Sequence, residues 1–165
     1  MTVINRSALV PFSATLMFKL VDDIEDYPAF LPWCKSTHII KREIDSDVIS
    51  AENTNSTADL NALNTVTASI EIAKAGLNKT FTTRNINTNQ NQIEMNLVDG
   101  PFKSLHGYWR FTPLDEHACK VTLDIEFDFS NKLLSMTLGP VFSQICNSLV
   151  NAFVSRAKDV YGSTS

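Results

Sequence analysis

Histidines are the residues of this chain best suited to acid–base or metal chemistry, and their spacing favours neither. His38, His106 and His117 are far apart in the 165-residue sequence, and none has the spacing of a metal-binding motif. The sequence also lacks a Gly-x-Ser-x-Gly nucleophile elbow and a phosphate-binding P-loop. We therefore expect no metal site, no catalytic residue and no required cofactor.

His106 could meet Asp99 or Tyr108, which are close to it in sequence. Along its predicted strand, however, it alternates with large apolar residues: Leu105, Trp109 and Phe111. Because successive side chains of a strand point to opposite faces, His106 faces solvent if those residues face a core. A catalytic site needs several convergent groups, so the sequence favours a non-enzymatic protein and leaves a cyclase-type enzyme as the weaker alternative.

Cysteine chemistry is also unpromising in this sequence. The chain has an odd number of cysteines, and they are far apart in sequence: Cys34, Cys119 and Cys146. This pattern is typical of free thiols in a reducing cytosol rather than of a disulfide framework. Cys119 has the inward register of its predicted strand and Cys146 falls on a predicted helix, so both are interpreted as small core residues.

An aromatic residue beside a cation marks a more promising position, in the stretch LVDGPFKSLHGYWRF (97–111). A hairpin turn explains Gly100 and Pro101, which supply turn geometry. A turn does not require Phe102 and Lys103 to follow it at once. This pair is therefore a candidate for the rim of a binding site.

Size and composition indicate one soluble globular domain spanning residues 1–165. The chain carries a formal net charge of −4 and is 44% hydrophobic. The mild acidity argues against DNA as a partner, since nucleic-acid binding needs a basic excess on one face. We expect no secretory signal and no transmembrane helix, and hence a cytoplasmic protein.

Patterning over the first 44 residues predicts a strand, two short helices and a second strand. Residues 2–10 alternate moderately, and Ser13 is the expected N-cap of a helix over 14–23. Two prolines restrict 24–34 to one short helical segment. Residues 37–44 are then predicted to form the second strand.

The segment 45–66 differs from the rest of the chain in composition. It holds four acidic residues, no Lys or Arg, and many Asn, Ser and Thr. So little apolar surface cannot offset the entropy of ordering, which predicts a solvated loop or a protruding hairpin. A partner-binding arm is the alternative interpretation of this polar insertion.

Period-2 alternation from residue 66 onward predicts a run of antiparallel strands. They are expected from 66 to the Gly76 turn, then at 77–86, 92–98, 105–114 and 119–129. Ser130 is the expected cap of a long apolar-striped helix that runs to about Tyr161, with a kink or restart at Gly139-Pro140. This order predicts a two-layer α+β domain, in which a curved antiparallel sheet packs against the C-terminal helix.

Strand parity places three lysines at one end of this sheet. A meander reverses at every turn, so the turns at Gly76 and Gly100 share an end with the start of the long helix. We call Lys74, Lys79 and Lys103 the rim lysines, and we expect Phe102 to lie among them at the mouth of a site. Such a rim suits an amphipathic ligand or an anionic surface, although lysines at turns are also common solvated groups.

Several long motifs resemble one family in order along the chain. They are ALVPFSATLMFKLVDDIEDYPAFLPWC, AKAGLNKTFTTR, LVDGPFKSLHGYWRFTPL, ACKVTLDIEFDFSNKLL and VSRAKDVYG. Together they resemble the family of ribosome association toxin RatA and coenzyme Q-binding protein, within the START-like, polyketide cyclase-like superfamily. The insertion departs from the family pattern. By position, the motif residues are 74–76, 79–81 and 99–103.

This resemblance implies a helix-grip fold with an apolar cavity between the sheet and the C-terminal helix. It implies two functions: binding a ubiquinone-type isoprenoid lipid in support of respiration, or associating with the large ribosomal subunit and blocking subunit joining. The first would make the protein peripheral to the inner membrane, with a transient membrane contact. Besides Phe102, the candidate lining residues, each equally suited to a packed core, are Phe81, Met95, Leu97, Trp109 and Phe111 from the sheet, and Leu138, Val141, Phe142 and Ile145 from the helix.

Overall fold

A seven-stranded antiparallel sheet forms the main layer of the protein, in a computed structural model that describes residues 1–44 and 63–162. The strand order is β1-β7-β6-β5-β4-β3-β2, so consecutive strands are neighbours from β2 onward and β1 closes against the last strand. Their bounds are β1 (Thr2–Val10), β2 (Cys34–Ile44), β3 (Leu63–Lys74), β4 (Leu77–Thr88), β5 (Gln92–Asp99), β6 (Phe102–Asp115) and β7 (Ala118–Phe129).

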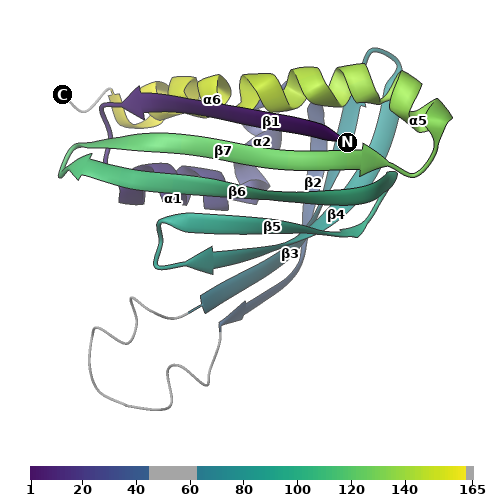
Figure 1. Cartoon of the computed structure of the whole chain (residues 1–165). Coiled ribbons are helices and arrows are strands. Elements are labelled where there is room, and N and C mark those ends of the chain that lie inside the picture. The colour runs from purple at the N-terminus through teal and green to yellow at the C-terminus, as the bar shows by residue number, and fades with distance from the viewer. Residues whose placement is uncertain (45–62, 163–165) are drawn as a thin grey trace.

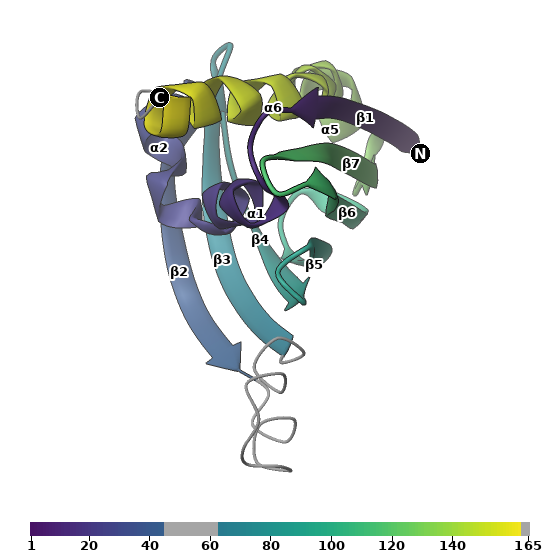
Figure 2. The same cartoon turned by 90° about the vertical axis from the view of Figure 1, so that its left-hand side faces the viewer.

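Helices cover the concave face of this sheet, as Figures 1 and 2 show. After β1 come α1 (Ala14–Asp22), the 3-10 turn η1 (Ile24–Asp26) and α2 (Tyr27–Phe30). After β7 come the short α5 (Lys132–Thr137) and the long α6 (Gly139–Tyr161). The sheet curves around α6, which confirms the predicted α+β helix-grip arrangement. None of the helices in the described ranges is long and apolar enough to span a membrane.

Local sequence signals account for the N-terminal elements. β1 has the predicted bounds, and Ser13 caps α1 because its hydroxyl oxygen accepts a hydrogen bond from the Leu16 N–H at 3.2 Å. The buried face of α1 carries Met17, Leu20 and Val21, among others, toward the core. The one short helical segment expected within 24–34 is present as α2, and the 3-10 turn η1 directly precedes it.

Three strands begin earlier than their own alternation predicted. β2 starts at Cys34, β3 at Leu63 and β6 at Phe102. Pairing with a neighbouring strand extends each one, since Cys34 faces Ile72 and Leu63 faces Thr88. The end of the predicted insertion therefore belongs to β3, whereas its residues 45–62 lie outside the described residues.

The C-terminal helical region begins one residue later than predicted. Asn131 caps α5 by accepting from the Leu134 N–H at 2.8 Å, and Ser130 instead donates its hydroxyl to the Pro101 carbonyl at 2.8 Å. The expectation that Ser130 is the cap is therefore wrong. The predicted restart at Gly139-Pro140 is confirmed: α5 ends at Thr137, and Pro140 occupies the first turn of α6, where its missing N–H costs nothing.

Candidate ligand-binding cavity

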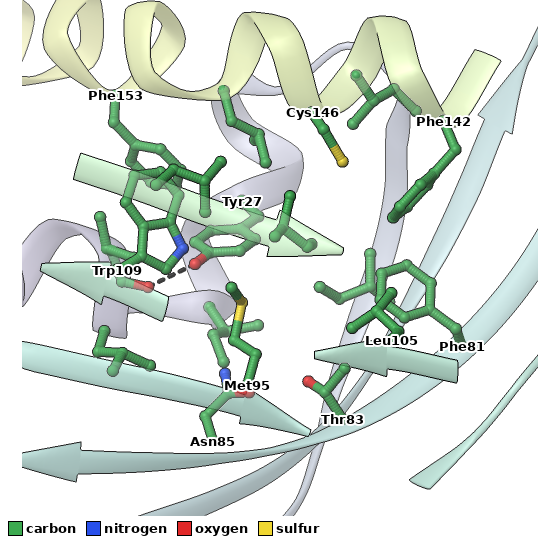
Figure 3. A pocket seen from close by; sticks show the side chains of 18 of the residues that line it. Tyr27, Phe81, Thr83, Asn85, Met95, Leu105, Trp109, Phe142, Cys146 and Phe153 are labelled. Atoms are coloured by element: carbon green, nitrogen blue, oxygen red, sulfur yellow. Dashed lines mark hydrogen bonds between the residues drawn. The ribbon is translucent and has the colours of Figure 1, made fainter. Parts of the chain in front are cut away.

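A cavity of about 70 Å³ lies between the concave face of the sheet and α6. Figure 3 shows it with side chains from the sheet below, α6 above and the N-terminal helices behind. Apolar and aromatic side chains predominate in its wall, among them Val21, Ile24, Trp33, Ile70, Leu105, Leu123, Ile125, Leu149 and Phe153. The cavity sits where the helix-grip fold implied one.

Five of the predicted lining residues reach this cavity. They are Phe81, Met95 and Trp109 from the sheet, and Phe142 and Ile145 from α6. Their places agree with the register of the strands and with the inward stripe of α6.

Four other predicted lining residues pack elsewhere in the core. Phe111 is 1% exposed, stacks on Trp109 and meets the Phe18 edge, so it lies behind the wall rather than on it. Leu138 is buried at the α5–α6 junction. Leu97 and Val141 pack partly buried against the core. An inward register therefore does not by itself distinguish residues that line the cavity from residues that are packed in the core.

Phe102 does not lie at the mouth of the cavity, contrary to expectation. It is 5% exposed and sits in an aromatic cluster, stacked on Phe129 at a centroid distance of 5.0 Å and edge-on to Phe142 at 4.9 Å. Phe81 and Phe127 complete the cluster. A register shift between Phe102 and Ser104 turns Phe102 inward and leaves Lys103 exposed.

The β5–β6 turn contacts both the start of the C-terminal helical region and β4, as the predicted shared end of the sheet requires. Pro101 in the β5–β6 turn accepts hydrogen bonds from both the N–H and the hydroxyl of Ser130, directly before α5. Gly100 packs so closely on β4 that an added Cβ would lie 2.7 Å from the Phe81 Cβ. Lys79 and Lys103 are exposed at this end and Lys74 is half-buried.

A polar corner on β4 interrupts the apolar wall of the cavity. Thr83 is buried and Asn85 lines the cavity, while Asn87 is buried and donates its amide to the Asp22 carboxylate at 2.7 Å. The Oδ1 of Asn85 is buried and has no hydrogen-bond partner among the described residues. Sequence reasoning missed these residues, although the alternation of β4 places them on the same face as Phe81.

The cavity wall offers little for catalysis. Asp22 is its one carboxylate among the described residues, and it is occupied by Asn87 and by Arg42 at 3.9 Å. Tyr27 donates its hydroxyl to the Val21 carbonyl, and burial raises the pKa of Tyr27. Burial likewise raises the pKa of the Cys146 thiol, which keeps it neutral.

Other reactive groups lie away from the cavity. His106 binds Glu94 at 2.8 Å on the outer face of the sheet, as its register predicted. Burial raises the pKa of both Cys34 and Cys119 to about 11. In residues 1–44 and 63–162, no group of three or more His, Cys, Asp or Glu side chains is placed to hold a metal ion.

Comparison with known proteins assigns this chain to a family. The sequence model described as "Polyketide cyclase / dehydrase and lipid transport" matches residues 10–154. Ribosome association toxin RatA of Vibrio cholerae is 46% identical over 162 residues, covering 98% of this chain and 99% of that one. RatA of Escherichia coli K12 is 42% identical over 161 residues, covering 98% and 90%. The chain belongs to the RatA branch of this family.

More distant similarities extend this result. A mitochondrial coenzyme Q-binding protein COQ10 of Dictyostelium discoideum is 23% identical over 155 residues, covering 90% of this chain and 65% of that one. A START superfamily protein from Mycobacterium smegmatis superposes with a TM-score of 0.71 at 17% identity, covering 96% and 98%. The Zhui aromatase/cyclase of Streptomyces has a TM-score of 0.71 at 16% identity, covering 95% and 93%. These two structures show the START-like fold.

Proposed function

We propose that this protein binds a hydrophobic ligand, a ubiquinone-type isoprenoid or related lipid, in the cavity between the sheet and α6. The observation that carries the proposal is the cavity itself, an apolar and aromatic space with a few convergent polar groups. The coenzyme Q-binding name of the distant relative supports the ligand class. The protein would act without catalysis, in the cytoplasm and peripherally at the inner membrane.

The size of the cavity limits what it holds as it stands. A volume of about 70 Å³ corresponds to a handful of water sites, each needing roughly 10–15 Å³. Drug-sized ligands occupy pockets of about 300–1,000 Å³. The cavity therefore accommodates a compact head group, and an isoprenoid tail requires α6 to move. The helix break at Gly139-Pro140 provides a hinge for that movement.

Native mass spectrometry with organic extraction tests this function. The purified wild-type protein should retain a quinone or lipid, or should bind an added ubiquinone analogue that has a ten-carbon side chain. Leu149→Phe fills the cavity from α6 and should abolish uptake, whereas Leu133→Phe on the exposed face of α5 should not. A wild-type protein that neither retains nor takes up any such ligand would show the proposal to be wrong.

A second function, association with the large ribosomal subunit and interference with subunit joining, is favoured by one observation. The relatives that match almost the whole chain at 42–46% identity are named ribosome association toxin RatA. The rim lysines, with Lys79 and Lys103 exposed, are the surface we propose for it. The net charge of −4 restricts contact with phosphates to a local patch.

Sucrose-gradient co-sedimentation with ribosomal subunits across a range of salt concentrations tests this second function. The protein should co-migrate with the large subunit at low salt and dissociate as salt rises. Lys79→Glu with Lys103→Glu should weaken co-migration, and Lys120→Glu, exposed at the opposite end of the sheet, should leave it unchanged. Failure to sediment with either subunit at any salt would exclude this function.

A further inference from the structure

Asn85 carries a buried amide oxygen without a hydrogen-bond partner among the described residues, between apolar residues of the two neighbouring strands. Its cross-strand neighbours on β3 and β5 are Val66 and Met95, and neither can form a hydrogen bond of ordinary strength with it. Its Oδ1 is buried and has no partner among the described residues. A buried polar atom in this state destabilises the protein unless something else satisfies it.

The neighbouring Asn87 is held through its amide nitrogen, although its Oδ1, like that of Asn85, is buried without a hydrogen-bond partner among the described residues. The Asn87 amide donates to Asp22 at 2.7 Å, which ties β4 to the end of α1. Asn85, two residues earlier on the same face, lines the cavity instead. Figure 3 shows Asn85 and Thr83 on the floor of the cavity, below Tyr27 and Trp109. Only the cavity side of Asn85 is available for a partner.

Thr83 supplies a second polar group on the same face. It is 6% exposed, lines the cavity, and precedes Asn85 by two residues, so the two side chains are roughly 6.6 Å apart along the strand. Aromatic side chains surround this corner, including Trp109, Phe81 and Phe142. The cavity thus combines an apolar space for a ring with a hydrogen-bond acceptor and a hydroxyl at its floor.

We propose that Asn85 and Thr83 bind the hydroxyl group of a phenol- or hydroquinone-type ring at the cavity floor. The ring hydroxyl would donate to Asn85 Oδ1, and Thr83 would donate to the ring oxygen. A quinone carbonyl only accepts hydrogen bonds, so it leaves Oδ1 unsatisfied while the Asn85 amide keeps the orientation seen in the structure. The site therefore prefers the reduced quinol to the oxidised quinone. This inference rests on the proposed ligand-binding function and adds the orientation and redox form of the ligand.

Tryptophan fluorescence can measure this preference directly. Trp33 and Trp109 are the two tryptophans of the chain, and both line the cavity. The fluorescence is followed under anaerobic conditions during titration with a ubiquinol analogue that has a ten-carbon side chain, and separately with its oxidised quinone. The two titrations give one Kd value each. One added hydrogen bond predicts that the wild-type protein binds the quinol about five- to tenfold more tightly.

Variants on the two faces of the sheet isolate the effect of Asn85. Asn85→Leu should bring the two Kd values within about twofold by removing that hydrogen bond. Thr83→Val should weaken binding of both forms and keep the preference, because the Thr83 hydroxyl donates to the ring oxygen of either form. Asn96→Leu makes the same change on β5 beside His106, on the outer face, and should keep the wild-type preference. Asn85→Leu should also unfold at the same or a higher temperature, because it removes an unsatisfied group.

The outcomes separate this inference from the function on which it rests. Equal wild-type affinity for quinol and quinone, or a preference retained in a folded Asn85→Leu variant, would overturn the assignment and leave ligand binding intact. Absence of binding for both forms would refute the ligand-binding function and this inference with it. Quinol preference lost in Asn85→Leu and kept in Asn96→Leu would establish both.

Discussion

Truncation of Phe102 separates a packing role from a role at a binding-site rim. The side chain is 5% exposed and contacts four other phenylalanine rings, with centroid distances from 4.9 to 6.2 Å. Phe→Ala in a core typically costs about 3–5 kcal/mol of stability. Each well-oriented aromatic pair contributes about 0.5–1.5 kcal/mol beyond its buried area. We therefore expect Phe102→Ala to lie in the upper part of that range.

This magnitude is large relative to the stability of a domain. A folded domain is stable by about 5–15 kcal/mol, so Phe102→Ala removes a large fraction of the total. For 150–250 residues, 1 kcal/mol shifts the Tm by about 2–4 °C, and we expect a fall of about 8–20 °C for a loss of 4–5 kcal/mol. Urea titration should show the same loss as a lower midpoint with an unchanged slope.

Exposed neighbours provide the controls for this experiment. Lys103→Ala, one residue along the chain, and Leu133→Ala, with Leu133 70% exposed on α5, should each change stability by less than about 0.5 kcal/mol. A Phe102→Ala variant with wild-type Tm that loses bound ligand would refute the packing argument. It would place Phe102 in the rim role that the sequence suggested.

Three further predictions concern the cap, one turn and the thiols. Asn131→Ala removes the side chain that accepts from Leu134 and should cost about 1 kcal/mol in urea unfolding. An Asn131→Ala variant as stable as the wild type would contradict the assignment. Gly100→Ala, at φ +142° with its added Cβ 2.7 Å from Phe81 Cβ, should destabilise by more than about 1 kcal/mol, and a neutral result would show that the turn rearranges. Burial raises the pKa of all three thiols, so the reactive thiolate is scarce in the folded protein at pH 7. A maleimide reagent at pH 7 should therefore label the folded protein slowly and the urea-unfolded protein three times per chain, at Cys34, Cys119 and Cys146. Rapid labelling of the folded protein would show that the thiols are not buried.

Elements defined by local signals were predicted well from the sequence. β1 and α1 have the predicted extents, because alternation and a serine cap are properties of the segments themselves. The restart of the C-terminal helix followed from Pro140 in the same way. In each case the information lies within one short stretch of chain.

Elements defined by distant partners were predicted less well. Simple alternation back from Leu105 points Phe102 outward, and the register shift against β7 reverses it. Phe111 shares the inward register of Trp109, yet α1 decides that Phe111 is packed while Trp109 borders the cavity. Alternation along β4 from Phe81 is a signal that could have placed Asn85 inward, but its lack of a partner depends on its neighbours on β3 and β5.

The position of β1 has a consequence for how the chain is made. Among the strands of residues 1–44 and 63–162, β1 pairs with β7 alone, and Thr2 faces Phe127 across that pairing. During synthesis at about 5–20 residues per second, this first strand waits roughly 6–25 s before its partner is translated. Its alternating apolar side chains and open backbone are exposed to other nascent chains for that time. The addition of β1 to the sheet is therefore timed by the translation of β7 rather than by the speed of strand pairing.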